Sequence, residues 1–219
     1  MDMLDFRKSI EAGDVEAVES ELASGRELVD ATVIWGHRQE CKSDPLHFVC
    51  DCVAEHWIDS EIAAELARVL LAQGATVDGA NGRETPLLGA TSLGVEKVAN
   101  ILIESGASFE VTSVFGARPL HWAAYMGLPS TVEKLVQGGA EIEARCTEFG
   151  ATPLFWAVHG FGPRGPDNAE GQITAARALI RAGAAIDTTN KDGLTAIACS
   201  RRADSREMHD LLRNSTDAR

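Results

Sequence analysis

Several side chains able to move protons stand out in the sequence. Asp51, Glu55 and His56 lie close together, and His159 stands far downstream beside the glycine-rich segment GFGPRGPDNAEG. Carboxylates and imidazoles are the usual general acids and bases of enzymes. Because no activated nucleophile is evident, proton transfer by Asp51 and His159 is the catalytic chemistry that these residues would support. An acid among aromatic neighbours has its pKa shifted by desolvation; solvated surface charge is the competing interpretation.

A second group has the residue types that bind transition metals: Cys41, His47, Cys50, Cys52 and His56. The spacing C-x₈-C-x-C is not a recognised zinc pattern. On a helix, Cys50 and Cys52 would project about 200° apart, so their thiolates cannot easily share one ion. We therefore predict structural cysteines and neither a metal nor a cofactor. The sequence also lacks a phosphate-binding loop, a nucleophile elbow, a dinucleotide fingerprint and the H-E-x-x-H zinc motif.

The elements that must position these side chains are clearest in residues 118–140, RPLHWAAYMGLPSTVEKLVQGGA. Pro119 suits the first position of a helix, and Gly127 can adopt the left-handed conformation that ends one. The apolar residues of VEKLV recur at spacings of three and four, which predicts a second, amphipathic helix. Two such short helices cannot bury their apolar faces alone, so the unit requires stacked copies of itself.

Copies of this unit recur along the chain. A closing Gly-Ala pair follows four of the helices. The openings are DPLH at 44–47, TPLL at 85–88, RPLH at 118–121, TPLF at 152–155 and a worn TAIA at 195–198. A step of about 33 residues with a T-P-L-H opening resembles the ankyrin repeat, and the resemblance covers nearly the whole chain.

The resemblance implies an all-α fold: one ankyrin-repeat solenoid of about six helix-pair units, with short finger hairpins between them. It places residues 1–219 in a single domain. The expected boundaries are a cap at 1–34, repeats at 35–79, 80–111, 112–144 and 145–187, and a polar, charged cap at 188–219.

Composition limits the function classes. The formal net charge is −13, and 45% of the residues are hydrophobic. Acidity argues against nucleic acid and anionic membrane as partners, and it allows a basic protein partner, although it often serves only solubility. We find neither a signal peptide nor an apolar run long enough to span a bilayer. Five cysteines, an odd number, suggest reduced thiols, so we expect a cytoplasmic protein.

Three segments are longer than a standard repeat needs. They are the finger at 35–44 and two insertions between helices, at 53–61 and 160–171. Ser60 is the expected N-cap of a helix over residues 62–71. Loops of this length in a compact fold are usually functional or disordered, and they suggest a bounded pocket.

In ankyrin repeats the fingers and first helices line a concave groove that carries the variable contact positions. Carried over to this sequence, the resemblance implies that function lies in this groove. Inter-repeat packing is the competing interpretation for the two tryptophans. The predicted groove residues are Trp35, Asp51, Phe115, Trp122, Tyr125, Met126, Phe149, Trp156 and His159.

The resemblance assigns other residues to the scaffold. His47 and His121 are the motif histidines, which we expect to hydrogen-bond backbone groups near the repeat junctions. Gly89 is expected to leave room beside Trp122, and Trp57 to close the same space from the side with Trp35.

The leading functional prediction is a non-enzymatic module that binds a segment of a partner protein in its groove. The alternative is a small-molecule pocket, which could be catalytic, built by the aromatic residues, the long finger and the two insertions. A purely structural role is the third possibility. The sequence names neither partner nor substrate.

Overall fold

The computed structural model describes residues 3–36, 41–80, 84–160, 166–202 and 206–217. The chain divides into two compact units, residues 1–108 and 109–219. The described residues form twelve α-helices, one short 3₁₀ helix and a single two-stranded hairpin. The prediction of a mainly helical fold with little strand is therefore confirmed. The repeat boundaries and a single solenoid body stay predictions.

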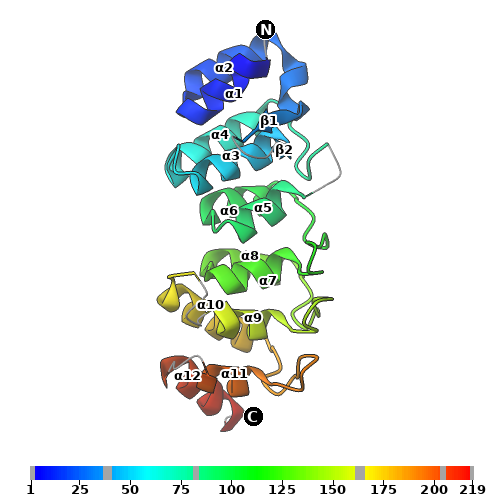
Figure 1. Cartoon of the computed structure of the whole chain (residues 1–219), viewed down its shortest axis with the longest axis vertical. Coiled ribbons are helices and arrows are strands. Elements are labelled where there is room, and N and C mark those ends of the chain that lie inside the picture. Colours follow the sequence, from blue (N-terminus) through cyan, green and yellow to red (C-terminus); the bar gives the residue numbers. More distant parts are fainter. Residues whose placement is uncertain (1–2, 37–40, 81–83, 161–165, 203–205, 218–219) are drawn as a thin grey trace. The chain divides into compact units, whose positions relative to one another are not determined.

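The first unit consists of three stacked helix pairs. Each pair packs its own two helices together, α3 also contacts α1 and α5, and α4 also contacts α2 and α6 (Figure 1). First helices therefore stack on first helices and second helices on second. The elements are α1 (Met3–Ala12), α2 (Val15–Ser24), the 3₁₀ helix η1 (Arg26–Asp30), β1 (Val33–Trp35), β2 (Cys41–Ser43), α3 (Pro45–Ala54), α4 (Ser60–Ala72), α5 (Pro86–Ser92) and α6 (Glu96–Glu104).

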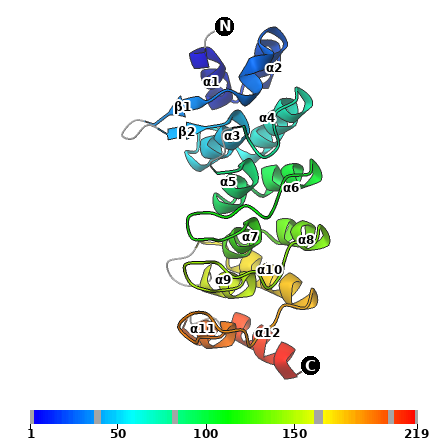
Figure 2. The same ribbon diagram turned by 90° about the vertical axis from the view of Figure 1, so that its right-hand side faces the viewer.

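The second unit repeats this arrangement. Here α9 contacts both α7 and α11, while α10 contacts both α8 and α12 (Figure 2). Helix pairs that are too short to bury a core alone thus gain one from their neighbours. The elements are α7 (Pro119–Met126), α8 (Pro129–Gln137), α9 (Pro153–Gly160), α10 (Ala169–Arg181), α11 (Ala196–Arg202) and α12 (Arg206–Asp217).

Helix ends follow the sequence signals with one exception. Pro119 is the first residue of α7, and Gly127 ends the helix with φ 69°, as predicted. The predicted N-cap Ser60 is wrong. Asp59 caps α4, because its carboxylate accepts hydrogen bonds from the backbone N–H groups of Glu61 and Ile62, both at 2.9 Å. Ser60 is the first residue of the helix instead.

A finger hairpin precedes α3. Strands β1 and β2 pair antiparallel, with Val33 opposite Ser43 and Trp35 opposite Cys41. This confirms a short finger hairpin at the first long segment, although residues 37–40 lie outside the described part of the chain. The first insertion is partly helical, since α3 extends to Ala54. Residues 161–165 of the second insertion also lie outside the described residues.

The C-terminal segment is more regular than its polar sequence suggests. Helix α12 packs on α11 and α10. It buries Met208 and Leu212, which are one helical turn apart and therefore lie on one face. Among the described residues no helix is long and apolar enough to cross a membrane.

We predict that Leu135→Ala lowers the free energy of unfolding by about 2–5 kcal/mol, because Leu135 is fully buried in α8 and its truncation leaves a cavity. Chemical denaturation of the full chain measures this loss. Leu4→Ala is the matched control, since Leu4 is 44% exposed and its removal should change stability by less than about 0.5 kcal/mol. Equal losses in the two variants would contradict the packing described here.

Candidate functional site

A chain of polar side chains joins the finger of unit 1 to α3. The Trp35 Nε1–H donates to Ser43 Oγ at 2.9 Å, and the Ser43 hydroxyl donates to Asp51 Oδ2 at 2.8 Å. Trp35 also packs on Phe48 and Trp57, with ring centroids 5.7 and 6.1 Å apart. Trp35 and Trp57 are thus in contact, whereas their closing of the space beside Trp122 stays a prediction. Ser43 was missed in the sequence analysis because a lone serine in a finger carries no distinguishing pattern.

Asp51 is not a solvated surface acid, since only 12% of its side chain is exposed. Burial raises the pKa of Asp51 above its ordinary value. The nearby His47 and the Ser43 hydroxyl lower this pKa, while Glu84 and Glu55 add to the rise. Its carboxyl group is turned toward Ser43 and His47, and a substrate would have to displace these contacts before it could exchange a proton.

His47 plays the structural role predicted for it. Its Nδ1–H donates to the carbonyl oxygen of Glu84 at 3.2 Å, which leaves Nε2 facing Asp51 Oδ1 at 3.8 Å. A Cβ atom on Gly89 would come within 2.8 Å of the His47 ring, so this glycine makes room for His47. The expectation that Gly89 leaves room beside Trp122 stays a prediction.

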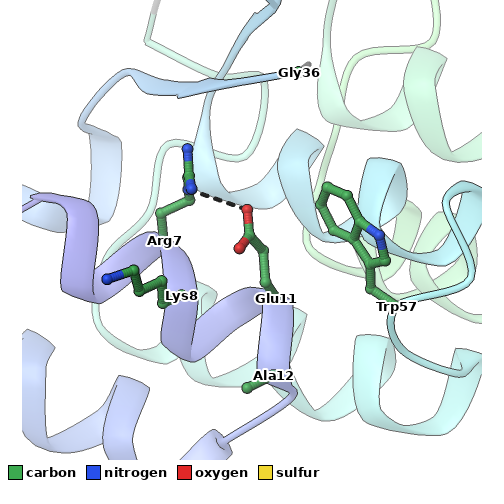
Figure 3. A pocket seen from close by; sticks show the side chains of 6 residues that line it. All are labelled: Arg7, Lys8, Glu11, Ala12, Gly36 and Trp57. Carbon is green, nitrogen blue, oxygen red and sulfur yellow. Dashed lines mark ion pairs between the residues drawn. The ribbon is translucent and has the colours of Figure 1, made fainter.

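An open hollow lies between α1 and the loop after α3 (Figure 3). Its volume is about 620 Å³, and it is lined by Arg7, Lys8, Glu11, Ala12, Gly36 and Trp57. Arg7 pairs with Glu11 at 3.0 Å and donates to the Ile34 carbonyl oxygen at 3.0 Å. Lys8 is exposed and has no such partner among the described residues. The lining therefore offers a ligand the ammonium group of Lys8 and the aromatic ring of Trp57.

Cys50 and Cys52, the two buried cysteines of α3, show no sign of reactivity. Burial raises the pKa of Cys50 and of Cys52 well above the ordinary thiol value, so both are protonated and poor metal ligands or nucleophiles. Among the described residues, no three histidine, cysteine or acidic side chains gather as a metal site would require.

Unit 2 contains a connected group of aromatic side chains, here called the aromatic cluster. Its centre is Trp156 of α9, which lies 5.0 Å from Trp122, 5.8 Å from Tyr125 and 6.2 Å from Phe149, measured between ring centroids. Phe115 closes the group by contacting Trp122 at 6.1 Å and Phe149 at 6.4 Å. Four rings thus form a closed circuit of contacts that links two finger turns to two first helices.

The cluster has a buried layer and an exposed layer. Trp156 is only 6% exposed and belongs to a buried core with Phe155 and Cys146, whereas Phe115 and Phe149 are 39% and 45% exposed. Inter-repeat packing, the competing interpretation for this tryptophan, therefore accounts for most of the Trp156 ring. The two phenylalanines form the part of the cluster that a ligand can reach.

The finger turns that carry these phenylalanines are fixed to each other through their backbones. The carbonyl oxygen of Phe115 accepts from the backbone N–H of Glu148 at 3.0 Å and from Thr147 Oγ1 at 3.1 Å. Gly116 is required here, because a Cβ at its φ of 65° would come within 2.2 Å of Thr147. The backbone segments that carry the two rings are therefore fixed relative to each other.

The remaining predicted groove residues of unit 2 lie at the end of α7 and on α9. Tyr125 and Met126 are half-buried, and His159 is exposed, with its ring 6.3 Å from that of Tyr125. Tyr125 and His159 thus lie together with Trp122 and Trp156, whereas a single contact surface built from them stays a prediction. Asp51 and Trp35 belong to unit 1, so the two acid–base candidates, Asp51 and His159, are in different units.

Two residues that the sequence analysis did not select hold the end of α7 in place. Asn168 caps α10 and donates its Nδ2–H groups to the carbonyl oxygens of Met126 and Gly127 at 3.0 and 2.8 Å. The buried Gln172 donates to the Tyr125 carbonyl oxygen at 2.8 Å. Asparagine before a helical run is a cap signal that was available in the sequence.

His121 joins the start of α7 to the next finger. Its Nδ1 accepts from the backbone N–H of Arg118 at 3.2 Å, so Nε2 carries the proton and donates to the carbonyl oxygens of Ala144 and Ala151 at 3.1 and 3.2 Å. Burial lowers the pKa of His121 to about 4, against the opposing effect of these carbonyl hydrogen bonds. The predicted structural role of His121 is confirmed.

Charge is distributed unevenly along the chain. Residues 1–108 hold 20 acidic side chains against 8 lysines and arginines, whereas residues 109–219 hold 13 against 12. Almost all of the net negative charge therefore belongs to unit 1.

Comparison with known families supports the resemblance for one segment of the chain. The family model of the ankyrin repeat matches residues 115–147, a segment that runs from Phe115 through α7 and α8 to the next finger turn. The resemblance found in the sequence is confirmed over this segment.

We predict that Asp51→Asn stabilises unit 1 at pH 7. Because the pKa of Asp51 is raised, folding disfavours the charged form of this side chain. The contribution of Asp51 to stability is therefore fully present below about pH 4, where the side chain is protonated, and it is lost as the pH rises through the folded pKa. The gain of the variant over wild type should therefore disappear at acidic pH in urea unfolding. Glu65→Gln on the exposed face of α4 is the control. Destabilisation at pH 7 would show that the contact with His47 outweighs burial.

We predict that acid weakens unit 2 through His121. Because its pKa is about 4 when folded and about 6.5 when unfolded, stability is complete above pH 6.5 and falls by about 3 kcal/mol as pH drops toward 4. The His121→Gln variant should be less stable at pH 7 but should lack this share of the pH dependence. His159→Gln is the control, because His159 is exposed and its replacement should leave the stability at pH 7 nearly unchanged. An unchanged profile in His121→Gln would refute the assignment.

Proposed function

Since the chain carries an ankyrin repeat at residues 115–147, we propose that it is a non-enzymatic recognition module that holds a segment of a partner protein on the aromatic cluster of unit 2. Ankyrin repeats are generally protein–protein interaction modules. The partner would lie across the finger turns and the adjoining face of the first helices. The predicted groove residues of this unit would form that surface, with the buried Trp156 supporting it from the core: Phe115, Trp122, Tyr125, Met126, Phe149, Trp156 and His159.

The observation that carries the proposal is the exposed pair Phe115 and Phe149. Their rings are stacked, with centroids 6.4 Å apart and planes inclined by 25°. The two phenylalanines remain 39% and 45% exposed beside each other, and contiguous exposed apolar side chains mark interaction sites. Aromatic anchors of this kind supply a large part of the binding energy at interfaces.

The support beneath the two rings strengthens the proposal. Trp122 and Trp156 pack against them from below, and the backbone hydrogen bond from Glu148 to Phe115 fixes one finger to the next. A surface that is already ordered before binding loses little conformational entropy when the partner arrives. The cluster therefore has the rigidity that a recognition surface needs.

The groove residues of unit 1 enter the proposal differently. Trp35 and Asp51 are connected to each other through Ser43, so they would present a fixed finger rather than a free acid. A small-molecule site is the second candidate function, and the hollow beside Lys8 and Trp57 favours it. An NMR fragment screen in which the shifts gather on these two residues would support that candidate.

We predict that Phe149→Ala weakens partner binding by about fivefold or more, equivalent to about 1 kcal/mol, because it removes an exposed aromatic anchor. Linear peptides selected from a random display library on the full chain provide the ligands. Their affinities for wild type and variant are then compared by fluorescence anisotropy.

Leu4→Ala is the matched control, since it also removes an exposed apolar side chain but belongs to unit 1. The control should leave the affinities unchanged, and thermal unfolding should show that both variants stay folded. Selected peptides that bind Phe149→Ala as tightly as wild type would refute the proposed surface.

A further inference from the structure

Three successive finger turns of unit 2 present equivalent positions. Phe115, Phe149 and Asp192 each precede a glycine with positive φ, at 65°, 59° and 72°. The backbone connection between turns also repeats. The carbonyl oxygen of Phe115 accepts from Glu148 N at 3.0 Å, and that of Phe149 accepts from Lys191 N at 2.9 Å. Since the same hydrogen bond is made twice, Asp192 occupies the next place in a row that begins with the two phenylalanines.

The spacing of this row matches an extended chain. The centroids of Phe115 and Phe149 are 6.4 Å apart, and alternate residues of a β-strand lie on one face about 6.4–6.8 Å apart. A strand would keep this spacing at the third position, where the repeated backbone hydrogen bond places Asp192. A helix that repeated every four residues would turn by about 40° at each step, so its third contact would point away from the row. The row therefore fits residues i, i+2 and i+4 of an extended segment.

The negative charge of Asp192, at the third position, indicates which kind of partner side chain would contact this residue. Asp192 and Glu148 are exposed, and within the described residues neither carboxylate has a hydrogen bond or an ion pair. The cations nearby are engaged: Arg145 donates to the carbonyl oxygens of Gly150 and Thr189 at 3.0 and 2.7 Å, and Lys191 donates to the Thr147 carbonyl oxygen.

Arg118, which opens α7, is also engaged, because its Nη1 pairs with Glu110 and Glu141, both at 2.9 Å. Two free carboxylates thus remain beside two exposed rings. The complement of this surface is a segment with two apolar side chains and one cation.

We infer that the three finger turns recognise an extended protein segment in which two alternate residues are apolar and the next alternate residue is lysine or arginine. The apolar residues lie on Phe115 and Phe149, and the cation pairs with Asp192. This inference rests on the proposed function, and it adds the chemistry and the register of the partner.

The test uses fluorescein-labelled peptides and the full chain. Two peptides, SLSLSRS and SRSLSLS, carry the pattern in the two chain directions. Two more, SLSLSES and SESLSLS, replace arginine by glutamate. On wild type, one arginine peptide should bind about threefold to fivefold more tightly than its glutamate counterpart, the size expected of an exposed charge pair. Asp192→Lys should reverse this preference.

Glu133→Lys is the matched control, because it makes the same change in net charge on an exposed face of α8, outside the finger turns. It should keep the wild-type preference. A reversal in this control, or the absence of one in Asp192→Lys, would overturn the inference.

The outcome separates the inference from the proposed function. Display-selected peptides that require Phe149 but lack the alternating pattern, and that bind Asp192→Lys normally, would refute the register and leave the recognition surface in place. Selected peptides that do not require Phe149 would refute both.

Discussion

The buried imidazole of His121 is the contact on which the arrangement of unit 2 depends. It accepts from the backbone at the start of α7 and donates to Ala144 and Ala151, which flank the next finger turn. It also packs edge-on against Trp156 at 5.6 Å. One neutral side chain therefore fixes the position of a helix, a finger and the central ring of the aromatic cluster relative to one another. A charged imidazole could not accept from Arg118, so the burial that lowers its pKa also preserves the geometry of the finger that carries Phe149.

The contact of His121 with Trp156 lies beneath the two layers of the aromatic cluster. Trp156 and Cys146 belong to the core, and their burial provides the stability on which the exposed rings depend. Glycines at the finger turns then allow the backbones to approach closely enough to hydrogen-bond, which a Cβ at Gly116 would prevent. The exposure of Phe115 and Phe149 is thus a consequence of how the fingers are tied together. This explains how a chain with few aromatic residues can keep two of them at its surface without loss of order.

The fold was largely predictable from the sequence because the repeat signals are local. Pro119 and Gly127 set helix ends through their own backbone preferences, and the motif histidines recur at a fixed place in the unit. The errors came where a choice depended on a neighbour in space. Asp59 and Ser60 are both good caps, and only the entry angle of the chain decides between them. The contact of Gly89 with His47 was missed, because the sequence shows that space is needed but not which ring occupies it.

The candidate site was less predictable for the same reason. Its aromatic residues could be selected by type and by position in the repeat, but their division into buried and exposed layers depends on packing between repeats. Ser43, Asn168 and Gln172 were missed because each acts through a hydrogen bond to a residue distant in sequence. The burial of Asp51 likewise depends on the finger that precedes it, and its charge is disfavoured for that reason.

The net negative charge of this protein is unevenly distributed between its two units, and this affects which partner each unit can attract. A net charge of −13 allows a basic partner for the molecule as a whole, yet residues 109–219 are almost neutral. Within unit 2 the formal charges nearly cancel, so the unit's own preference for a cation at its finger turns would come from Asp192 and Glu148. A local pair of free carboxylates beside two apolar rings selects a particular residue of the partner, whereas diffuse acidity only raises the rate of encounter with any basic protein.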